Sequence, residues 1–173
     1  MSKIKKIILS SLFLAIFIIF NRFISIKTEL LIISLTFIPI IMSAILLGPK
    51  YSTLISLLGD FLGAIFFPFG PYFPGFTFNS ALTGLIYGLF LYNNGNEMSR
   101  KRFIICLLIS NIIHLFIINV FLTSFWIHIL YGKAYILIIT SRIITQIIMF
   151  PIQIITIYLL EKFSRPYVKK YLM

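Results

Sequence analysis

Long apolar runs separated by very short polar breaks constrain this chain more than any other feature of its sequence. The runs cover residues 7 to about 26, 30–47, 51–67, 75–92, 103 to about 125 and 136 to about 160. A helix needs roughly 20 residues to cross about 30 Å of hydrocarbon, so each run is a candidate membrane span. The chain is 60% hydrophobic and 11% charged, too apolar for a soluble domain. We therefore predict an all-α integral membrane protein, a six-transmembrane-helix bundle that forms a single domain over residues 1–173.

The basic residues predict the orientation of this bundle. If the N-terminus is cytoplasmic, only Arg22, Lys27 and Lys133 lie on the outer side. The other side then carries Lys3, Lys5, Lys6, Lys50, Arg100, Lys101, Arg102, Lys162, Arg165, Lys169 and Lys170. This asymmetry follows the positive-inside rule and places both termini in the cytoplasm. The net charge of +11 then indicates topology and contact with anionic lipid, not nucleic acid, because the basic residues are scattered over separate loops.

The segment FFPFGPYFPGFTF, residues 66–78, is unusual for a turn between two spans. Its aromatic rings are compatible with an interfacial belt, which is common in membrane proteins. However, Pro68, Pro71 and Pro74 stiffen the loop and hold those rings in a defined arrangement. The predicted topology puts this loop outside, together with Arg22 and Lys133. Ring faces and cations suit a flat aromatic ligand that carries carboxylates, so we predict an outward-facing ligand pocket.

Two charged residues, Asp60 and Arg142, fall inside apolar runs. An ionised group at the bilayer centre costs roughly 2.5–3.5 kcal/mol, so each needs a partner. In one interpretation they pair with each other or with backbone groups and lock the third and sixth helices. In the other, Arg142 contacts an anionic or hydrogen-bonding ligand at the base of the outward cavity, while Asp60 keeps a structural role.

Small residues recur at a spacing of four. The examples are Ser11 with Ala15, Gly59 with Gly63, and the series Ser80, Gly84, Gly88. Such spacings let helices approach closely in lipid. We expect the glycines to pack within the bundle. Ser11 and Ala15 lie on an otherwise bulky first helix, where a partner membrane protein could dock.

Enzymatic functions find little support in the sequence. The chain has one Asp within its spans, no HExxH motif and no glycine-rich phosphate loop. His114 and His128 lack carboxylate neighbours, and the former is typical of a hydrogen-bonded packing residue, whereas the latter, next to Trp126, could face a pocket. The single Cys106 offers neither a disulfide nor a metal spacing. We therefore expect no catalysis, no metal and no cofactor.

Four stretches carry a resemblance to a known family. They are NRFISI at 21–26, GDFLGAIFFPFGPYFPGFTFNSALTGLIYGLFL at 59–91, FWIHILYGKAY at 125–135 and SRIITQIIMFPIQ at 141–153. With the small residues of the first helix, they resemble the substrate-binding S component of an energy-coupling factor (ECF) transporter, of the folate-specific type. One departure is Thr145-Gln146, where members of the family often carry Lys-Asn.

The resemblance implies a mechanism and a set of residues. An S component of this type captures folate from outside, then topples on docking to a transmembrane coupling subunit driven by two ATPase subunits. The setting is the bacterial plasma membrane, crossed several times. Ser11 and Ala15 would lie on the docking surface. The candidate substrate-binding residues are Arg22, Tyr72, Phe73, Trp126, Tyr131, Lys133 and Arg142, of which the aromatic ones would stack on the ring and the cations would contact its polar edge or the glutamate.

Two alternatives stay open at this point. The first is an S component for another vitamin or a pterin-like compound, since S components share an architecture and differ in their pocket lining. The second is a membrane scaffold without a ligand, although a scaffold has no evident need of a rigid aromatic loop. A channel is disfavoured because no ring of charges or filter motif is present.

Overall fold

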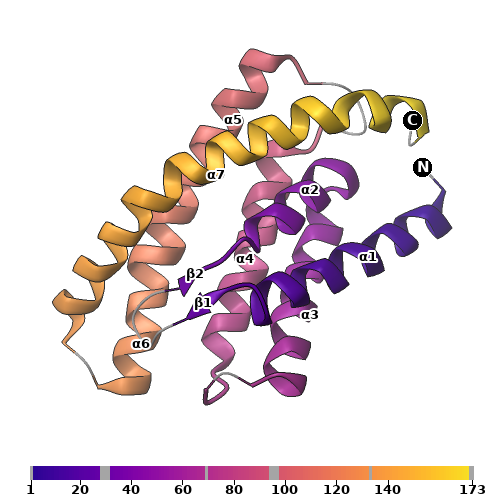
Figure 1. Cartoon of the computed structure of the whole chain (residues 1–173). Helices are drawn as coiled ribbons and strands as arrows, with labels where there is room; N and C mark the ends of the chain where they lie inside the picture. The colour runs from indigo at the N-terminus through magenta and orange to yellow at the C-terminus, as the bar shows by residue number, and fades with distance from the viewer. Residues whose placement is uncertain (1, 28–31, 69, 94–97, 133, 172–173) are drawn as a thin grey trace.

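The computed structural model describes residues 2–27, 32–68, 70–93, 98–132 and 134–171, without the side chains of 26–27, 32–33 and 163–171. Almost all of this part of the chain is helical (Figure 1). The helices are α1 (Lys3–Arg22), α2 (Phe37–Leu47), α3 (Pro49–Phe66), α4 (Pro74–Leu91), α5 (Arg100–Ile113), the π-helix η1 (His114–Leu122), α6 (Thr123–Tyr131) and α7 (Tyr135–Tyr171).

The helical stretches have the length and composition of a membrane protein. Within the described ranges, Lys3–Arg22, Arg100–Tyr131 and Tyr135–Lys162 are long and apolar enough to cross a bilayer. The second stretch is continuous through α5, η1 and α6 and contains 32 residues. Many large apolar side chains on these helices are exposed, as expected for surfaces that face lipid. The predicted all-helical membrane character is therefore confirmed at this level.

The connection between α1 and α2 differs from the prediction. The first run was expected to be helical to about residue 26 and the second to begin at residue 30, but α1 ends at Arg22 and α2 begins only at Phe37. Between them lie two short antiparallel strands, β1 (Ile26–Lys27) and β2 (Ile32–Ile33), with Ile26 opposite Ile33. β-Branched residues favour an extended backbone, so an isoleucine-rich segment can be apolar without being helical.

The boundary before the last helix was also predicted wrongly. The fifth run was expected to stop near residue 125, but α6 continues to Tyr131 and ends at Gly132, whose φ of 64° lies in the left-handed region. Glycine adopts this conformation at little cost and commonly terminates helices. α7 begins at Tyr135 and passes through Pro151 without ending.

Close packing of α3 on α4 confirms the predicted role of the small residues. A Cβ atom at Gly84 would collide with the Ser56 hydroxyl and the Ser52 carbonyl, and one at Gly88 would collide with Pro49. The Ser52 hydroxyl donates to the Gly84 carbonyl oxygen at 2.8 Å. Glycine thus lets the two backbones approach within hydrogen-bond reach of one another's side chains.

The apolar core of the described residues is built from α1, α2, α4, α5 and α7. Figure 1 shows both chain ends on one side, with β1, β2 and α6 away from them. The core includes Ile41 and Ala44 of α2, Tyr87 of α4, Leu107 of α5 and Ile157 of α7. Phe17, Phe37 and Ile40 of this core lie at the ends of α1 and α2 that adjoin the strands.

Candidate functional site

A cavity of about 550 Å³ occupies the end of the bundle that bears the hairpin. Its walls come from the end of α1, the start of α2, the second half of α3, the loop before α4, and from α4, η1, α6 and α7. Residues far apart in the sequence therefore share one space. The lining combines aromatic rings with two arginines and several amide side chains. Its volume lies within the roughly 300–1,000 Å³ that is usual for small-molecule sites.

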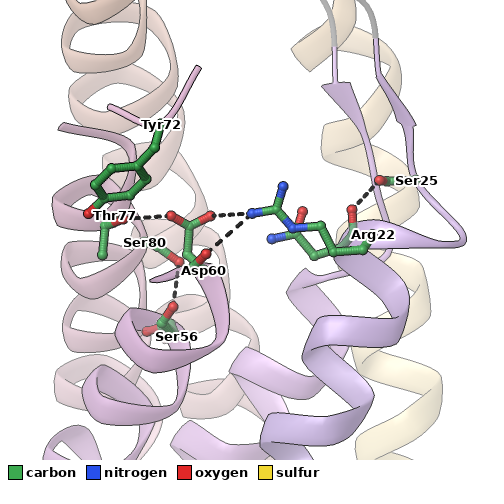
Figure 2. Close-up of polar contacts among 8 residues, drawn as sticks. Arg22, Ser25, Ser56, Asp60, Tyr72, Thr77 and Ser80 are labelled. Atoms are coloured by element: carbon green, nitrogen blue, oxygen red, sulfur yellow. Dashed lines mark hydrogen bonds and ion pairs between the residues drawn. The ribbon is translucent and has the colours of Figure 1, made fainter. Parts of the chain in front are cut away.

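An ion pair between α1 and α3 lies at the wall of this cavity (Figure 2). Arg22 Nη2 is 3.8 Å from Asp60 Oδ1 and donates to the Asp60 carbonyl oxygen at 3.2 Å. The Thr77 hydroxyl donates to Asp60 Oδ2 at 2.8 Å, and the Tyr72 hydroxyl lies 3.3 Å from that of Thr77. The approach of Arg22 depends on Gly63, where a Cβ atom would lie 2.7 Å from Arg22 Nε.

This arrangement corrects the interpretation in which Asp60 pairs with Arg142. The carboxylate of Asp60 is neutralised by Arg22 instead. Arg142 lies on α7 and is only 5% exposed, and its Nε atom has no hydrogen-bond partner among the described residues. Both arginines line the cavity. A buried guanidinium with an unused donor is suited to bind an anionic or hydrogen-bonding ligand.

The wall formed by α7 is a mainly polar stripe within the apolar stretch of that helix. Arg142, Gln146, Met149 and Gln153 all line the cavity and are buried. Their spacings of four, three and four residues place them on one helical face. Gln146 belongs to the Thr145-Gln146 pair that departs from the family pattern. Thr145 donates instead to the Ser141 carbonyl of its own helix at 2.9 Å, so of the pair only Gln146 reaches the cavity.

The structure places the aromatic candidates at different depths. Tyr72 and Phe73 of the proline-rich loop and Tyr131 of α6 line the cavity. Trp126 does not line it. Its ring centroid lies 5.5 Å from that of Phe73, and its indole N–H donates to Asn79 Oδ1 at 3.1 Å, so it lies behind the wall. Lys133 falls outside the described residues.

The two histidines also differ in position. His114 lines the cavity, its Nδ1 atom is 3.3 Å from Asn119 Nδ2, and its ring lies 5.5 Å from that of Tyr87. The prediction of a hydrogen-bonded packing residue is consistent with these contacts. His128, which was considered as a pocket residue, is exposed and does not line the cavity.

Several lining residues were not predicted from the sequence. They are Asn79 and Thr83 of α4, Asn119 and Thr123 near the π-helix, and Gln146 and Gln153 of α7. The spacing of four between Asn79 and Thr83 and of seven between the two glutamines is a detectable signal, because polar residues in apolar helices usually face the bundle interior. The π-helix has no comparable signature, and π-helical turns frequently occur at functional sites.

The predicted docking residues lie on a different surface. Ser11 and Ala15 are exposed on α1, on the same side as the exposed apolar residues Ile4, Ile8 and Leu12. None of these side chains lines the cavity. The small residues are therefore not used to pack α1 within the bundle.

Comparison with known proteins places this architecture in a family. The family model for the ECF-type riboflavin transporter S component matches residues 1–165. The chain belongs to this S-component family. Among curated relatives of this S component, the folate transporter FolT of Clostridium novyi (strain NT) is 35% identical over 158 residues, covering 91% of this chain and 88% of that protein. FolT of Leuconostoc mesenteroides is 30% identical over 155 residues, covering 87% and 80%.

A solved structure agrees with the fold of this S component. The crystal structure of FolT bound with folic acid superposes with a TM-score of 0.81 at 35% identity. The match covers 90% of this chain and 92% of that one. The likeness therefore extends over most of both chains.

Proposed function

We propose that this S component captures folate at the outer face of a bacterial plasma membrane and delivers it inward as part of an ECF-type vitamin importer. In this proposal the chain crosses the membrane six times, through α1, α2, α3, α4, the continuous stretch from α5 to α6, and α7. The excess of basic residues on the loops next to the chain ends supports cytoplasmic termini. The cavity then faces outward.

The observation that carries the proposal is the chemistry of the cavity in a chain so similar to a folic acid-bound FolT. Folate combines a flat pteridine, an aminobenzoyl ring and a glutamate with two carboxylates. The cavity offers Tyr72, Phe73 and Tyr131 as ring surfaces and Arg22 and Arg142 as cations. Aromatic stacking and charge-assisted hydrogen bonds are the interactions that these ligand parts need.

In this proposal some predicted site residues contact the ligand directly and others support it indirectly. Tyr72, Phe73, Tyr131 and Arg142 contact the ligand directly, since all of them line the cavity. Arg22 contributes through the donors that Asp60 leaves free. Trp126 supports the site from behind Phe73. Lys133 remains a predicted contact to the ligand.

The proposal is tested by calorimetric titration of folic acid into the detergent-purified protein, with riboflavin, thiamine and biotin as controls. We expect tight one-to-one binding of folic acid alone. Calorimetry is preferred to fluorescence because the single tryptophan lies behind the cavity wall. Failure of the folded protein to bind folic acid would remove the folate assignment.

Riboflavin is the second candidate ligand, because the family model that matches the chain is described for riboflavin transporters. Its isoalloxazine ring would use the same aromatic residues, but it has no carboxylates to pair with Arg142. Tight binding of riboflavin without binding of folic acid would favour this alternative.

Transport itself requires partners in this proposal. The S component is non-catalytic, and two separate ATPase subunits act through a transmembrane coupling subunit that docks on Ser11 and Ala15. Exposure of both residues on an apolar face of α1 supports this role. A bulky side chain there would prevent close helix approach.

We therefore predict that Ala15→Trp abolishes co-purification with co-expressed coupling and ATPase subunits and leaves folic acid affinity within about threefold, since it is remote from the cavity. Ile148→Trp, on an exposed position of α7, is the matched control and should retain the complex. A normal complex with Ala15→Trp would place the docking surface elsewhere.

A further inference from the structure

A chain of hydrogen bonds with a single direction runs from α6 to α4, back to α6 and on to η1. The indole N–H of Trp126 donates to Asn79 Oδ1 at 3.1 Å. Asn79 Nδ2 donates to the Thr123 hydroxyl at 3.0 Å. That hydroxyl donates to the Ile118 carbonyl oxygen at 2.7 Å, which also accepts the Thr123 backbone N–H in the π-helical turn. The Asn79 amide of α4 therefore links two residues of α6, one of which is bonded to η1.

The chemistry of these groups determines which way the Asn79 amide faces. An indole N–H can only donate, so the atom that faces Trp126 must be the amide oxygen. The single hydroxyl hydrogen of Thr123 is used on Ile118, so Thr123 must accept from the amide nitrogen. In a flipped amide, the NH2 group would face the indole N–H of Trp126. The amide oxygen would then face the Thr123 hydroxyl oxygen, whose hydrogen is already donated to Ile118. The amide is thus locked in one orientation.

The locked amide belongs to the cavity wall. Asn79 is 6% exposed and lines the cavity, whereas Trp126 does not. After its two bonds, the amide retains one N–H and one oxygen lone pair. A buried donor and acceptor of fixed polarity discriminate strongly between ligands, because a mismatched ligand leaves them unpaired.

This inference rests on the proposed function. We propose that the Asn79 amide hydrogen-bonds to the polar edge of the pteridine. Trp126 and Thr123 are positioning residues that hold this amide in the orientation suited to folate. The edge of folic acid presents the ring N3–H donor beside the 4-oxo acceptor. Aminopterin, otherwise identical, presents a ring nitrogen acceptor beside a 4-amino donor. A rotatable amide can pair with either ligand by turning over, whereas a locked amide pairs with only one.

The test is the ratio of dissociation constants for aminopterin and folic acid, measured by calorimetry. We expect a ratio of about ten or more for the wild type, because the locked amide mismatches aminopterin. Trp126→Phe keeps a ring against Phe73 but removes the N–H, so the ratio should fall to about three or less. Asn79→Leu should weaken folic acid binding and remove the discrimination as well. Thr123→Val, which removes the other partner of the amide, should lower the ratio in the same direction.

The matched control is Phe125→Leu. Phe125 packs on the Trp126 ring at 5.1 Å between centroids, is 43% exposed and does not line the cavity. The substitution disturbs the packing of the indole without touching the hydrogen-bond chain, so the ratio should stay at the wild-type value. A general loosening of the site would lower the ratio in this variant too and would contradict the proposal.

The outcomes separate this inference from the function on which it rests. If the wild type binds folic acid but Trp126→Phe and Thr123→Val keep the wild-type ratio, the locked amide is overturned and the folate assignment stands. A wild-type ratio near one would likewise overturn the locked amide and leave the folate assignment in place. If the folded wild type binds neither pteridine, both the assignment and the inference are overturned.

Discussion

Two arginines line the same cavity, yet only one of them has a carboxylate partner among the described residues. Arg22, at the end of α1, pairs with Asp60 of α3. Arg142, on α7, is 5% exposed and its Nε atom has no hydrogen-bond partner in the part of the chain that the structure describes. Two arginines on the same cavity can therefore differ in what compensates their charge: Arg22 links α1 to α3 through Asp60, whereas the charge of Arg142 is left for the proposed ligand.

The physical difference lies in what compensates each charge. Asp60 neutralises Arg22 and is itself held by the Thr77 hydroxyl, so the charges on the wall formed by α1, α3 and α4 compensate each other, although Arg22 Nε, like Arg142 Nε, has no hydrogen-bond partner among the described residues. Arg142, beside Gln146, keeps a positive charge that no carboxylate of the described ranges compensates. A lone charge within a membrane protein is costly. An anionic ligand that reaches Arg142 would therefore supply the compensating negative charge that Asp60 supplies to Arg22.

Removal of Arg142 should therefore change ligand affinity more than any other proposed substitution. We predict that Arg142→Ala weakens folic acid binding about 100-fold or more, because the ligand carboxylate or ring edge loses its buried charged partner. The melting temperature should change little, since no carboxylate is left unpaired. Calorimetry and thermal unfolding measure the two quantities. Arg142→Lys, which keeps the charge, should lose less affinity, and affinity within about threefold for Arg142→Ala would contradict the role.

A second prediction concerns the tightly packed wall. Gly84→Ala should lower the free energy of unfolding by about 1–3 kcal/mol, because the new methyl group would collide with Ser52 and Ser56 of α3. Gly70→Ala is the control, since its Cβ atom would lie 3.7 Å from the nearest heavy atom, the Tyr131 hydroxyl oxygen. Equal unfolding midpoints for the two variants would show that close approach of α3 and α4 is not required.

The smallest predicted effect is the coupling of Arg22 with Asp60. A double-mutant cycle on the free energy of unfolding with Arg22→Ala and Asp60→Ala should give a coupling energy of about 1–2 kcal/mol, because each single variant leaves the other charge without its partner. The same cycle with Arg142→Ala and Asp60→Ala should give less than about 0.5 kcal/mol. A larger coupling for the second pair would reverse the distinction between the two arginines.

Sequence patterns predicted the membrane character and much of the cavity lining. Arg22, Tyr72, Phe73, Tyr131 and Arg142 were all chosen from the sequence and all line the cavity. The arginines and the loop aromatics stood out because charges and proline-stiffened aromatics are conspicuous in apolar runs, whereas Tyr131 was implied by the resemblance to S components. Trp126 was conspicuous in the same way, but its indole faces Asn79, and rarity alone does not indicate which way a ring turns.

The errors have physical causes of their own. Residues 32–36 were wrongly predicted as helix because hydropathy does not distinguish an apolar strand from an apolar helix. The break after the fifth run was drawn too early because polar and aromatic residues near Trp126 resemble a loop, although they continue α6 to Tyr131. The π-helix at His114–Leu122 depends on backbone hydrogen bonds that no composition reveals.

Local composition was enough to predict the apolar segments, the asymmetry of basic residues, the close-packing glycines and the likeness to S components. Which groups meet, however, depends on the packed bundle. Arg22 and Asp60 are 38 residues apart, and Asn79 and Trp126 are 47 apart. Such pairings depend on how each helix is rotated and how far it is shifted against its neighbours. Packing of the whole bundle sets that geometry, so the partner of each charge and the orientation of the Asn79 amide emerge only from the folded chain.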